Sequence, residues 1–397
     1  MSRLSNVFKP GSGYQAFFLS MIAWGLAYGL YKGAIENYFA EIVAMSEFDR
    51  GVSEFFRELP GLSLIFILAI LYTLSAEKIY KIGAVIMLVG MVMHAMVPPA
   101  RVFVTLSVFI YSLGEHIQLG MKNTLSLEYA REGKGGTALG LQNSANQAGT
   151  VVGYLVIMIL FFLTGSTMTA FRGVFWAAAA VLSVSFFAAS FMKSTSHPAE
   201  TKNRFYFKKK FRKYYMLELF YGARKQVFFT FGPYVLILFY GASTSTISLL
   251  FAISAVTSFF ASPLIGKIID RFGYKIVMIT DTLILVAVCF FYGFAHHLFP
   301  MHTAFIICCI NYLLDSVISL ASMASNVYVQ DLADSPEEVR ATISTGLSVN
   351  HLVTILIALF GGWIWHTLGI ETLFILSAIL GLCNSAYAAT IKTSCKT

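Results

Sequence analysis

The chain has 397 residues, of which 57% are hydrophobic and only 12% are charged. Soluble domains carry about 25% charged residues, so this composition excludes a water-soluble enzyme, a disordered chain, a disulfide scaffold and a collagen-like rod. The net charge of +8 concentrates around residues 208–213, between two apolar halves. A cytoplasmic membrane loop explains this placement, and we predict no nucleic-acid partner.

Apolar windows bounded by charges or turn residues predict twelve transmembrane helices. In chain order they cover residues 14–42, 51–75, 83–99, 102–121, 137–163, 170–192, 214–241, 244–264, 276–296, 301–325, 342–367 and 370–391. The sequence therefore predicts an all-α polytopic membrane protein in three parts. These are an N-terminal six-helix bundle at 1–192, a basic cytoplasmic linker at 193–213 and a C-terminal six-helix bundle at 214–397.

The distribution of basic residues predicts the orientation in the membrane. With the N-terminus inside, 21 of the 28 Lys and Arg residues fall on inner loops or termini, and only Arg50, Arg101 and Arg172 fall outside. The positive-inside rule then gives a multi-pass protein of the cytoplasmic (inner) membrane with both termini cytoplasmic. Under this topology, Glu47, Asp49 and Arg50 are expected to form a solvated outer rim.

Two short stretches recur at an offset of 193 residues. YGLYK at 28–32 resembles YGARK at 221–225, and Glu77-Lys78 corresponds to Asp270-Arg271. Two matches at one offset indicate an internal duplication, which is typical of transporters built from repeats. We therefore expect the two halves to be six-helix pseudo-repeats.

The segment GKIIDRFGYK at 266–275 resembles the G-x-x-x-D-R-x-G-x-[RK] loop of the major facilitator superfamily. With the predicted spans and the basic central segment, the resemblance covers nearly the whole chain. It implies a conformational latch in which a glycine permits close helix packing and an acid faces a helix N-terminus. The implied latch residues are Gly266, Asp270, Arg271 and Gly273. The first-half loop SAEKIYK at 75–81 keeps an acid–base pair but lacks both glycines.

Glycines recur at short intervals in two predicted helices. Gly25 and Gly29 lie four residues apart in the first, and Gly140, Gly149 and Gly153 partly match the antiporter motif of the superfamily in the fifth. Small residues at this spacing favour close helix packing. The alternative interpretation is that the fifth helix indicates exchange or efflux.

Charged side chains at bilayer depth cost about 2.5–3.5 kcal/mol on insertion scales, so each needs a partner or a water-filled cavity. The resemblance implies a central cavity lined by helices 1, 2, 4, 5, 7, 8, 10 and 11. The intramembrane polar residues fall on these helices, and helices 3, 6, 9 and 12 are almost free of charge. The predicted substrate-binding residues are Lys32, Arg57, Asn143, Asn146, Arg224 and Lys225. The predicted proton-coupling residues are Glu36, Glu58, Glu115, His116, Asp315 and His351.

Lys32 and Lys225 occupy equivalent positions in the proposed repeat. Two cations that face one cavity suit a carboxylate or a phosphate. The alternative is structural: Lys32 neutralises Glu36 one turn away, and Arg224 and Lys225 pair with Asp315 or a nearby acid.

The resemblance implies a monomeric secondary transporter that works by alternating access, with no enzymatic activity and no cofactor. We expect a small organic anion or zwitterion as the solute, a proton or a counter-solute as the coupling partner, and membrane lipid around the protein. One alternative is multidrug efflux of cations, with Glu36, Glu54 or Asp315 deciding affinity. A rival from another class is a non-transporting membrane enzyme or receptor on the same fold.

Three histidines, His296, His297 and His302, fall in a predicted outer loop. They could bind a metal loosely, but a solvated loop is the simpler interpretation. We therefore predict no metal site.

Overall fold

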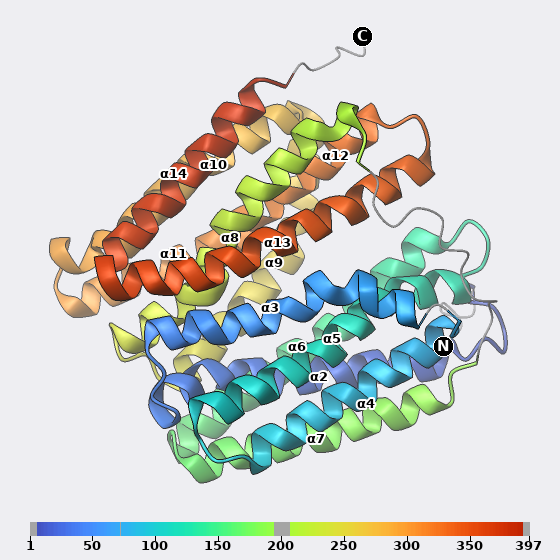
Figure 1. Cartoon of the computed structure of the whole chain (residues 1–397), viewed down its shortest axis with the longest axis horizontal. Coiled ribbons are helices and arrows are strands. Elements are labelled where there is room, and N and C mark those ends of the chain that lie inside the picture. The colour runs from blue at the N-terminus through green and yellow to red at the C-terminus, as the bar shows by residue number, and fades with distance from the viewer. Residues whose placement is uncertain (1–5, 72, 194–206, 392–397) are drawn as a thin grey trace. The chain divides into compact units, whose positions relative to one another are not determined.

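The computed structural model describes residues 6–71, 73–193 and 207–391 (Figure 1). The regular secondary structure of these residues is helical, and the one bridge among them joins Phe8 to Ala130. Nine helices in the described part of the chain are long and apolar enough to cross a membrane. The predicted all-α class is confirmed, whereas the total of twelve spans and the two-repeat layout stay predictions.

The internal contacts divide the chain into two compact units. Unit 1 comprises Met1–Ala44, Phe56–Lys202 and Ser243–Ala252, and unit 2 comprises Met45–Phe55, Asn203–Ala242 and Ile253–Thr397. Residues 45–55, from the first half of the sequence, thus belong to unit 2. Residues 243–252, from the second half, belong to unit 1. Most of the predicted linker at 193–213 lies outside the described residues.

Unit 1 is built on close contact between its first and fifth long helices. Its helices are α2 (Tyr14–Asn37) with a π-helical extension (Tyr38–Ile42), most of α3 (Glu47–Ile70), α4 (Ala76–Met96), α5 (Arg101–Tyr129), α6 (Gly135–Thr164) and α7 (Met168–Ser190). α2 packs on α6 and α7, and α4 packs on α5 and α7. A Cβ atom on Gly25 would lie 2.0 Å from the backbone oxygen of Asn146, and one on Gly149 would lie 2.3 Å from that of Ile22. The predicted close packing is confirmed at these glycines, but a Cβ atom on Gly140 would meet nothing within 4 Å.

Unit 2 has a corresponding set of helix neighbours. Its helices are α8 (Arg212–Leu238), most of α9 (Thr244–Phe272), α10 (Tyr274–Leu298), α11 (Met301–Ile318), a 3₁₀ turn (Ser319–Ser322), α12 (Met323–Leu332), α13 (Pro336–Leu368) and α14 (Ile370–Ala389). α8 packs on α13 and α14, and α10 packs on α11 and α14. A Cβ atom on Gly222, the counterpart of Gly29, would lie 2.8 Å from the side-chain amide of Asn350 on α13.

Several helices extend beyond the apolar windows that predicted them. The span expected at 102–121 continues in α5 to Tyr129, and the span expected at 244–264 continues in α9 to Phe272. Hydropathy stops at the first charges, Lys122 and Lys267, but backbone hydrogen bonds continue into water wherever the residues favour a helix.

The end of the basic segment is attached to the start of α13. Lys208 Nζ lies 2.9 Å from Glu338 Oε1, and Lys210 Nζ lies 2.7 Å from Asp334 Oδ2. Hydrogen bonds to Asp334 and Glu338 raise the pKa of Lys210. This part of the segment is therefore packed on unit 2.

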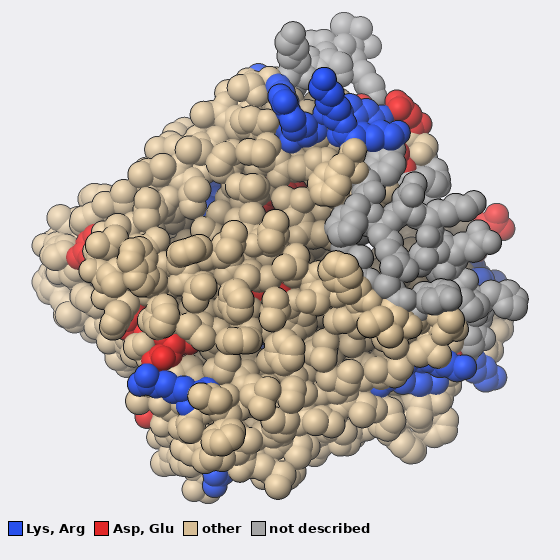
Figure 2. Space-filling view, in the orientation of Figure 1, with Lys and Arg blue, Asp and Glu red and all other residues tan. Residues whose placement is uncertain are grey.

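Large apolar side chains lie on the outer surface of the described helices. Phe162 is 80% exposed and Ile70 is 79% exposed. Most of the face drawn in Figure 2 carries no charge, and the visible Lys and Arg side chains gather near its margins. A continuous apolar surface of this kind is suited to lipid rather than water.

Candidate functional site

Lys32 and Glu36 form an ion pair one turn apart on α2. Lys32 Nζ lies 2.5 Å from Glu36 Oε1, and the two side chains are 12% and 1% exposed. The ammonium also lies 5.6 Å from the ring centre of Phe251, a residue of unit 1. The predicted pairing of Lys32 with Glu36 is confirmed, so this lysine is already neutralised within α2.

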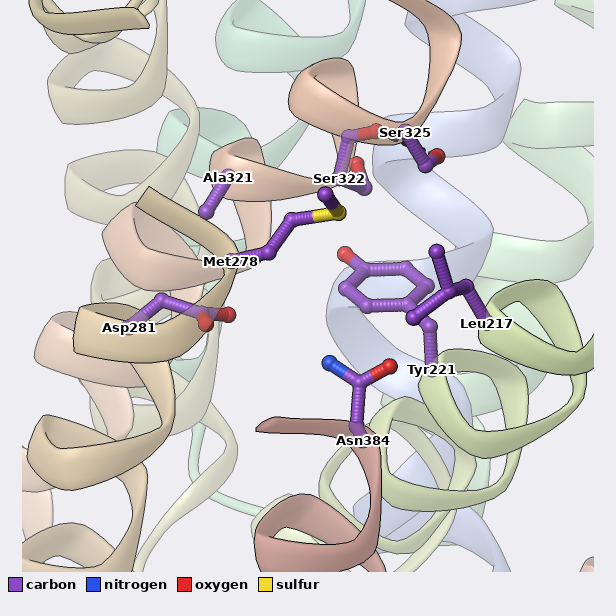
Figure 3. A pocket seen from close by; sticks show the side chains of 8 residues that line it. All are labelled: Leu217, Tyr221, Met278, Asp281, Ala321, Ser322, Ser325 and Asn384. Carbon is purple, nitrogen blue, oxygen red and sulfur yellow. Dashed lines mark hydrogen bonds between the residues drawn. The ribbon is translucent and has the colours of Figure 1, made fainter. Parts of the chain in front are cut away.

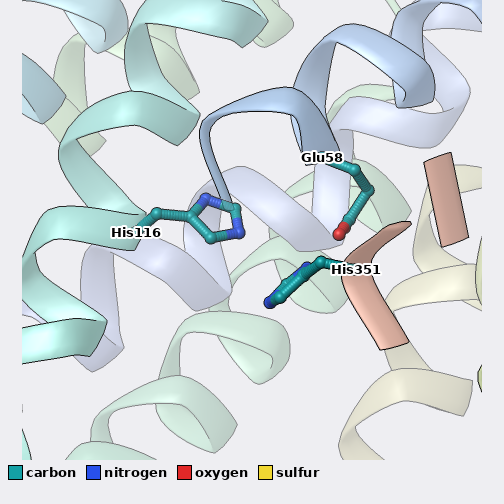
Figure 4. Close-up of side chains that lie close together, drawn as sticks. All are labelled: Glu58, His116 and His351. Atoms are coloured by element: carbon teal, nitrogen blue, oxygen red, sulfur yellow. The ribbon is translucent and has the colours of Figure 1, made fainter. Parts of the chain in front are cut away.

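A second group of charges joins α3 and α5. Arg57 pairs with the adjacent Glu58, and the hydroxyl of Ser112 donates a hydrogen bond to the backbone oxygen of Arg57. His116 is buried, with Nδ1 placed 3.0 Å from the Ser112 hydroxyl. Figure 4 shows Glu58 on α3 and His116 on α5. The contact between α3 and α5 at Ser112 thus brings together residues more than fifty positions apart in the sequence.

Glu115 is a buried acid on α5 of unit 1. Its side chain is 7% exposed, and no described residue donates a hydrogen bond to its carboxylate. It lies within electrostatic reach of Arg57, Glu58, Lys32 and Lys122. The predicted proton-coupling residue is therefore surrounded by charges of both signs.

The amides of the fifth predicted helix have different environments. Asn146 donates a hydrogen bond of 3.0 Å to the backbone oxygen of Met21 on α2, at the same contact that requires Gly25. Asn143 is exposed. The amide of Asn146 therefore stabilises a helix contact in this structure, and the substrate-binding role expected for both residues stays a prediction.

Arg224 is buried in unit 2 against an acid that the sequence interpretation overlooked. Its guanidinium Nη2 lies 2.6 Å from Asp281 Oδ2 on α10, and the side chains are 3% and 7% exposed. Asp281 is the one charged residue of the predicted helix 9 at 276–296, which had been described as almost free of charge. An isolated acid within the apolar run 276–296 was the available signal, because such a residue needs a buried cation.

A small cavity lies beside this pair and is lined by residues of α8, α10, the 3₁₀ turn, α12 and α14 (Figure 3). Asp281 from α10 and Asn384 from α14 border the space next to the ring of Tyr221 from α8. Two side-chain atoms here, Asn384 Oδ1 and Arg224 Nη1, are buried and have no hydrogen-bond partner among the described residues. The full lining consists of Leu217, Tyr221, Met278, Asp281, Ala321, Ser322, Ser325 and Asn384.

Lys225, next along α8, differs from Arg224. Its side chain is exposed, and it forms no salt bridge with any described residue. Asp315 on α11 lies within electrostatic reach of Lys225 and Arg224, and no described residue donates a hydrogen bond to its carboxylate. His351, the other proton-coupling candidate of unit 2, lies on α13.

The predicted latch residues surround a tight turn between α9 and α10. Gly273 has φ +83°, which favours glycine, and it separates the last residue of α9 from the first residue of α10. Asp270 and Arg271 are exposed, and a Cβ atom on Gly266 would meet nothing within 4 Å. The turn explains the second glycine of the motif, and the latch itself stays a prediction.

Arg50 was expected to lie in a solvated outer rim, but the structure places it in a buried position. It is 2% exposed and donates a hydrogen bond of 2.9 Å to Glu54, which is 1% exposed. Gln226 on α8 donates a second hydrogen bond of 3.0 Å to the same carboxylate. The spacing of Arg50 and Glu54 by one helical turn was visible in the sequence, but their burial depends on the packing of residues 45–55 in unit 2.

Comparisons with known proteins give one partial match in sequence and several matches in fold. A sequence profile of the Major Facilitator Superfamily matches residues 215–392. Solved structures similar to the chain include the nucleoside transporter NupG (TM-score 0.74, 15% identity, 97% of this chain and 100% of that one) and a D-xylose-proton symporter (0.74, 15%, 97% and 99%). A POT family transporter in complex with 5-aminolevulinic acid is also similar (0.75, 11%, 94% and 94%).

No curated protein sequence matches the chain. At identities of 11–15%, the solved structures show the fold alone, and the profile supplies the link in sequence. Apolar helices, fold and profile agree with the resemblance carried by the GKIIDRFGYK segment. The chain is a multi-pass membrane protein whose residues 215–392 match the major facilitator superfamily and whose fold is similar to that of solved transporters.

Proposed function

We propose that this protein is a secondary transporter of the major facilitator superfamily that carries a small organic anion or zwitterion across the cytoplasmic membrane, coupled to protons or to exchange. The predicted halves at 1–192 and 214–397, joined by the linker at 193–213, provide alternating access. Between the two classes of solute, the charges of the described residues favour a zwitterion.

The proposal is based on the environments of Lys225 and Asp315. One is an exposed cation without a salt bridge to a described residue, and the other is a carboxylate without a hydrogen-bond donor among them. They lie within electrostatic reach of each other on neighbouring helices. A zwitterion satisfies both, because its carboxylate pairs with Lys225 and its ammonium pairs with Asp315.

The charges of unit 1 support a solute without net charge. Lys32 is neutralised by Glu36, and Arg57 is neutralised by Glu58. Glu115 and Lys122, which lie within electrostatic reach of each other, are also of opposite sign. These charges balance one another, so they give unit 1 no excess of positive charge that would favour a phosphate or a dicarboxylate.

Glu115 is the first candidate for proton coupling. Its carboxylate is buried, and protonation would remove a negative charge within electrostatic reach of Arg57 and Lys32. A proton symporter is among the solved structures of similar fold. We retain Glu36, Glu58, His116, Asp315 and His351 as further candidates, to be ranked by proton-flux measurements on single variants.

The test compares ligand-induced stabilisation in two matched lysine variants. Lys225→Met keeps the aliphatic stem and removes the charge, and Lys267→Met does the same at an exposed position outside the proposed site. The probes are 5-aminolevulinic acid, amino acids and dipeptides, with monoanions and cationic drugs as comparison sets. A bound ligand raises stability by about 2.7 kcal/mol at one hundred times its Kd.

We expect a zwitterion to raise the melting temperature of wild type and of Lys267→Met but not that of Lys225→Met. The same zwitterion should be taken up by proteoliposomes containing wild type. Stabilisation of Lys225→Met equal to that of wild type would contradict the role of Lys225 and the zwitterion assignment.

Cation efflux is the second candidate, because unit 2 contains more acids than bases around this site. Glu218, Asp281 and Asp315 outnumber Arg224 and Lys225. Efflux predicts stabilisation by cationic drugs that survives Lys225→Met and disappears in Asp315→Asn. The same thermal panel therefore separates the two functions.

A further inference from the structure

Two histidines and a glutamate converge where the last turn of α10 meets the first turn of α14. His296 Nε2 lies 3.3 Å from Glu371 Oε1, and His297 Nε2 lies 2.8 Å from the same oxygen. The three ligand atoms all lie within 4.8 Å of one another. The solvated loop expected here is wrong, because His296 and His297 belong to α10 and Glu371 comes from a distant part of the sequence.

The two distances from the histidines to Glu371 are close to the ligand spacing of a tetrahedral metal site. Zinc–nitrogen and zinc–oxygen bonds of about 2.0–2.2 Å at tetrahedral angles place ligand atoms about 3.3 Å apart. The observed distances of 3.3 and 2.8 Å are close to this edge length. Two imidazoles and one carboxylate are also the ligand set of three-coordinate protein zinc sites that keep a fourth position for water.

We propose that His296, His297 and Glu371 form a binding site for Zn²⁺ at this end of unit 2. The side chains of the three residues are 11%, 57% and 30% exposed, so an ion and its water ligand can reach the site. Both imidazoles coordinate through Nε2 in the neutral form, and the carboxylate offsets one of the two positive charges of the metal. Under the predicted orientation, this end of α10 faces the outside of the cell.

The site would join two helices that pack along each other. α10 and α14 are neighbours within unit 2, and the ring of His296 contacts Phe239 at the end of α8. A metal ion that binds ligands from both helices stabilises the folded unit, because it binds the unfolded chain much more weakly. The effect does not involve Lys225 or Asp315, so this inference and the proposed function can fail independently.

The experiment uses Co²⁺ as a spectroscopic substitute for Zn²⁺ on the full chain in detergent, purified without a histidine tag. Tetrahedral Co²⁺ gives intense visible absorption bands that octahedral Co²⁺ in water lacks. The variants are His297→Ala and Glu371→Gln, with His302→Ala as the matched control. His302 is an exposed histidine in the first turn of α11 and is not one of the three ligands.

We expect wild type and His302→Ala to bind one equivalent of Co²⁺ with tetrahedral bands that Zn²⁺ abolishes. Loss of a ligand should weaken binding by more than about 100-fold, because loss of an outer-shell partner alone costs 10–100-fold. Melting temperatures without metal show whether each variant is folded. If His297→Ala is not folded, Glu371→Gln provides the test of ligand loss. Absence of tetrahedral bands in wild type, or equal affinity in wild type and a folded ligand variant, would mean that the histidines only donate hydrogen bonds to Glu371.

Discussion

At Arg224, unit 2 holds a permanently charged guanidinium of which only 3% reaches the surface. The side chain is tolerated because Asp281 lies 2.6 Å away and the ring of Tyr221 lies 4.9 Å from the guanidinium carbon. Arg50 and Glu54 show the same arrangement within α3. An intact pair of this kind contributes little to the free energy of folding. Removing one partner is costly, because the remaining charge stays buried.

Breaking the pair at Asp281 should destabilise the protein strongly. We expect Asp281→Ala to lower the free energy of unfolding by about 3–5 kcal/mol, because Arg224 then lacks its partner. Chemical denaturation in detergent measures the loss. Asp334→Ala removes an acid that is 87% exposed and should cost less than about 1 kcal/mol. Equal denaturation midpoints for the two variants would refute the structural role of the pair.

The double variant Arg224→Met with Asp281→Leu tests the same pair in the opposite direction. Removing both charges leaves no unpaired ion, so the double variant should be more stable than Asp281→Ala. A double variant as unstable as the single one would show that packing, rather than charge, determines the loss.

At the level of elements, glycines decide how closely α2 and α6 approach. Gly25, Gly29, Gly149 and Gly153 each face backbone atoms of the other helix at distances that exclude a Cβ atom. The four-residue spacing in the sequence predicted this contact correctly. The spacing did not identify the partner helix, because the same pattern fits any close crossing.

Gly25→Ala should therefore separate α2 from α6. A Cβ atom 2.0 Å from the backbone oxygen of Asn146 cannot be accommodated without backbone movement, and we expect a loss of at least about 1–3 kcal/mol. Gly140→Ala is the matched control on α6: nothing lies within 4 Å, and removing a helical glycine should gain about 0.5–1 kcal/mol. Thermal unfolding followed by fluorescence distinguishes the two, and a stable Gly25→Ala variant would rule out the tight crossing.

At the level of the whole molecule, helices, apolar surface and basic residues together describe a protein in a bilayer. Nine described helices meet the length and composition required to cross it. The imbalance of Lys and Arg across the predicted loops predicts the orientation, because positive residues are retained on the cytoplasmic side.

Single cysteines report this orientation directly. In a background with the five native cysteines replaced, His302→Cys should react in intact cells with a membrane-impermeant maleimide. Lys267→Cys should react only after the membrane is permeabilised, because the turn after α9 is predicted to be cytoplasmic. The reverse pattern of labelling would place the termini outside.

Hydropathy and charge patterning were sufficient to predict the all-α class, the approximate helix positions and the resemblance to the superfamily. Local spacing was sufficient for the pair of Lys32 with Glu36, because residues one turn apart on a helix are neighbours whatever the fold. These features depend on interactions within a few residues or with the surrounding solvent, which the sequence encodes directly.

Contacts between distant segments were decided by the tertiary structure alone. Asp281 reaches Arg224 across 57 residues, and Glu371 reaches His297 across 74, because α10 packs beside α11 and α14 while α14 packs on α8. The burial of Arg50 likewise depends on where residues 45–55 pack. A sequence shows that a charge in an apolar run needs a partner, but only the packing of helices determines which residue lies within reach.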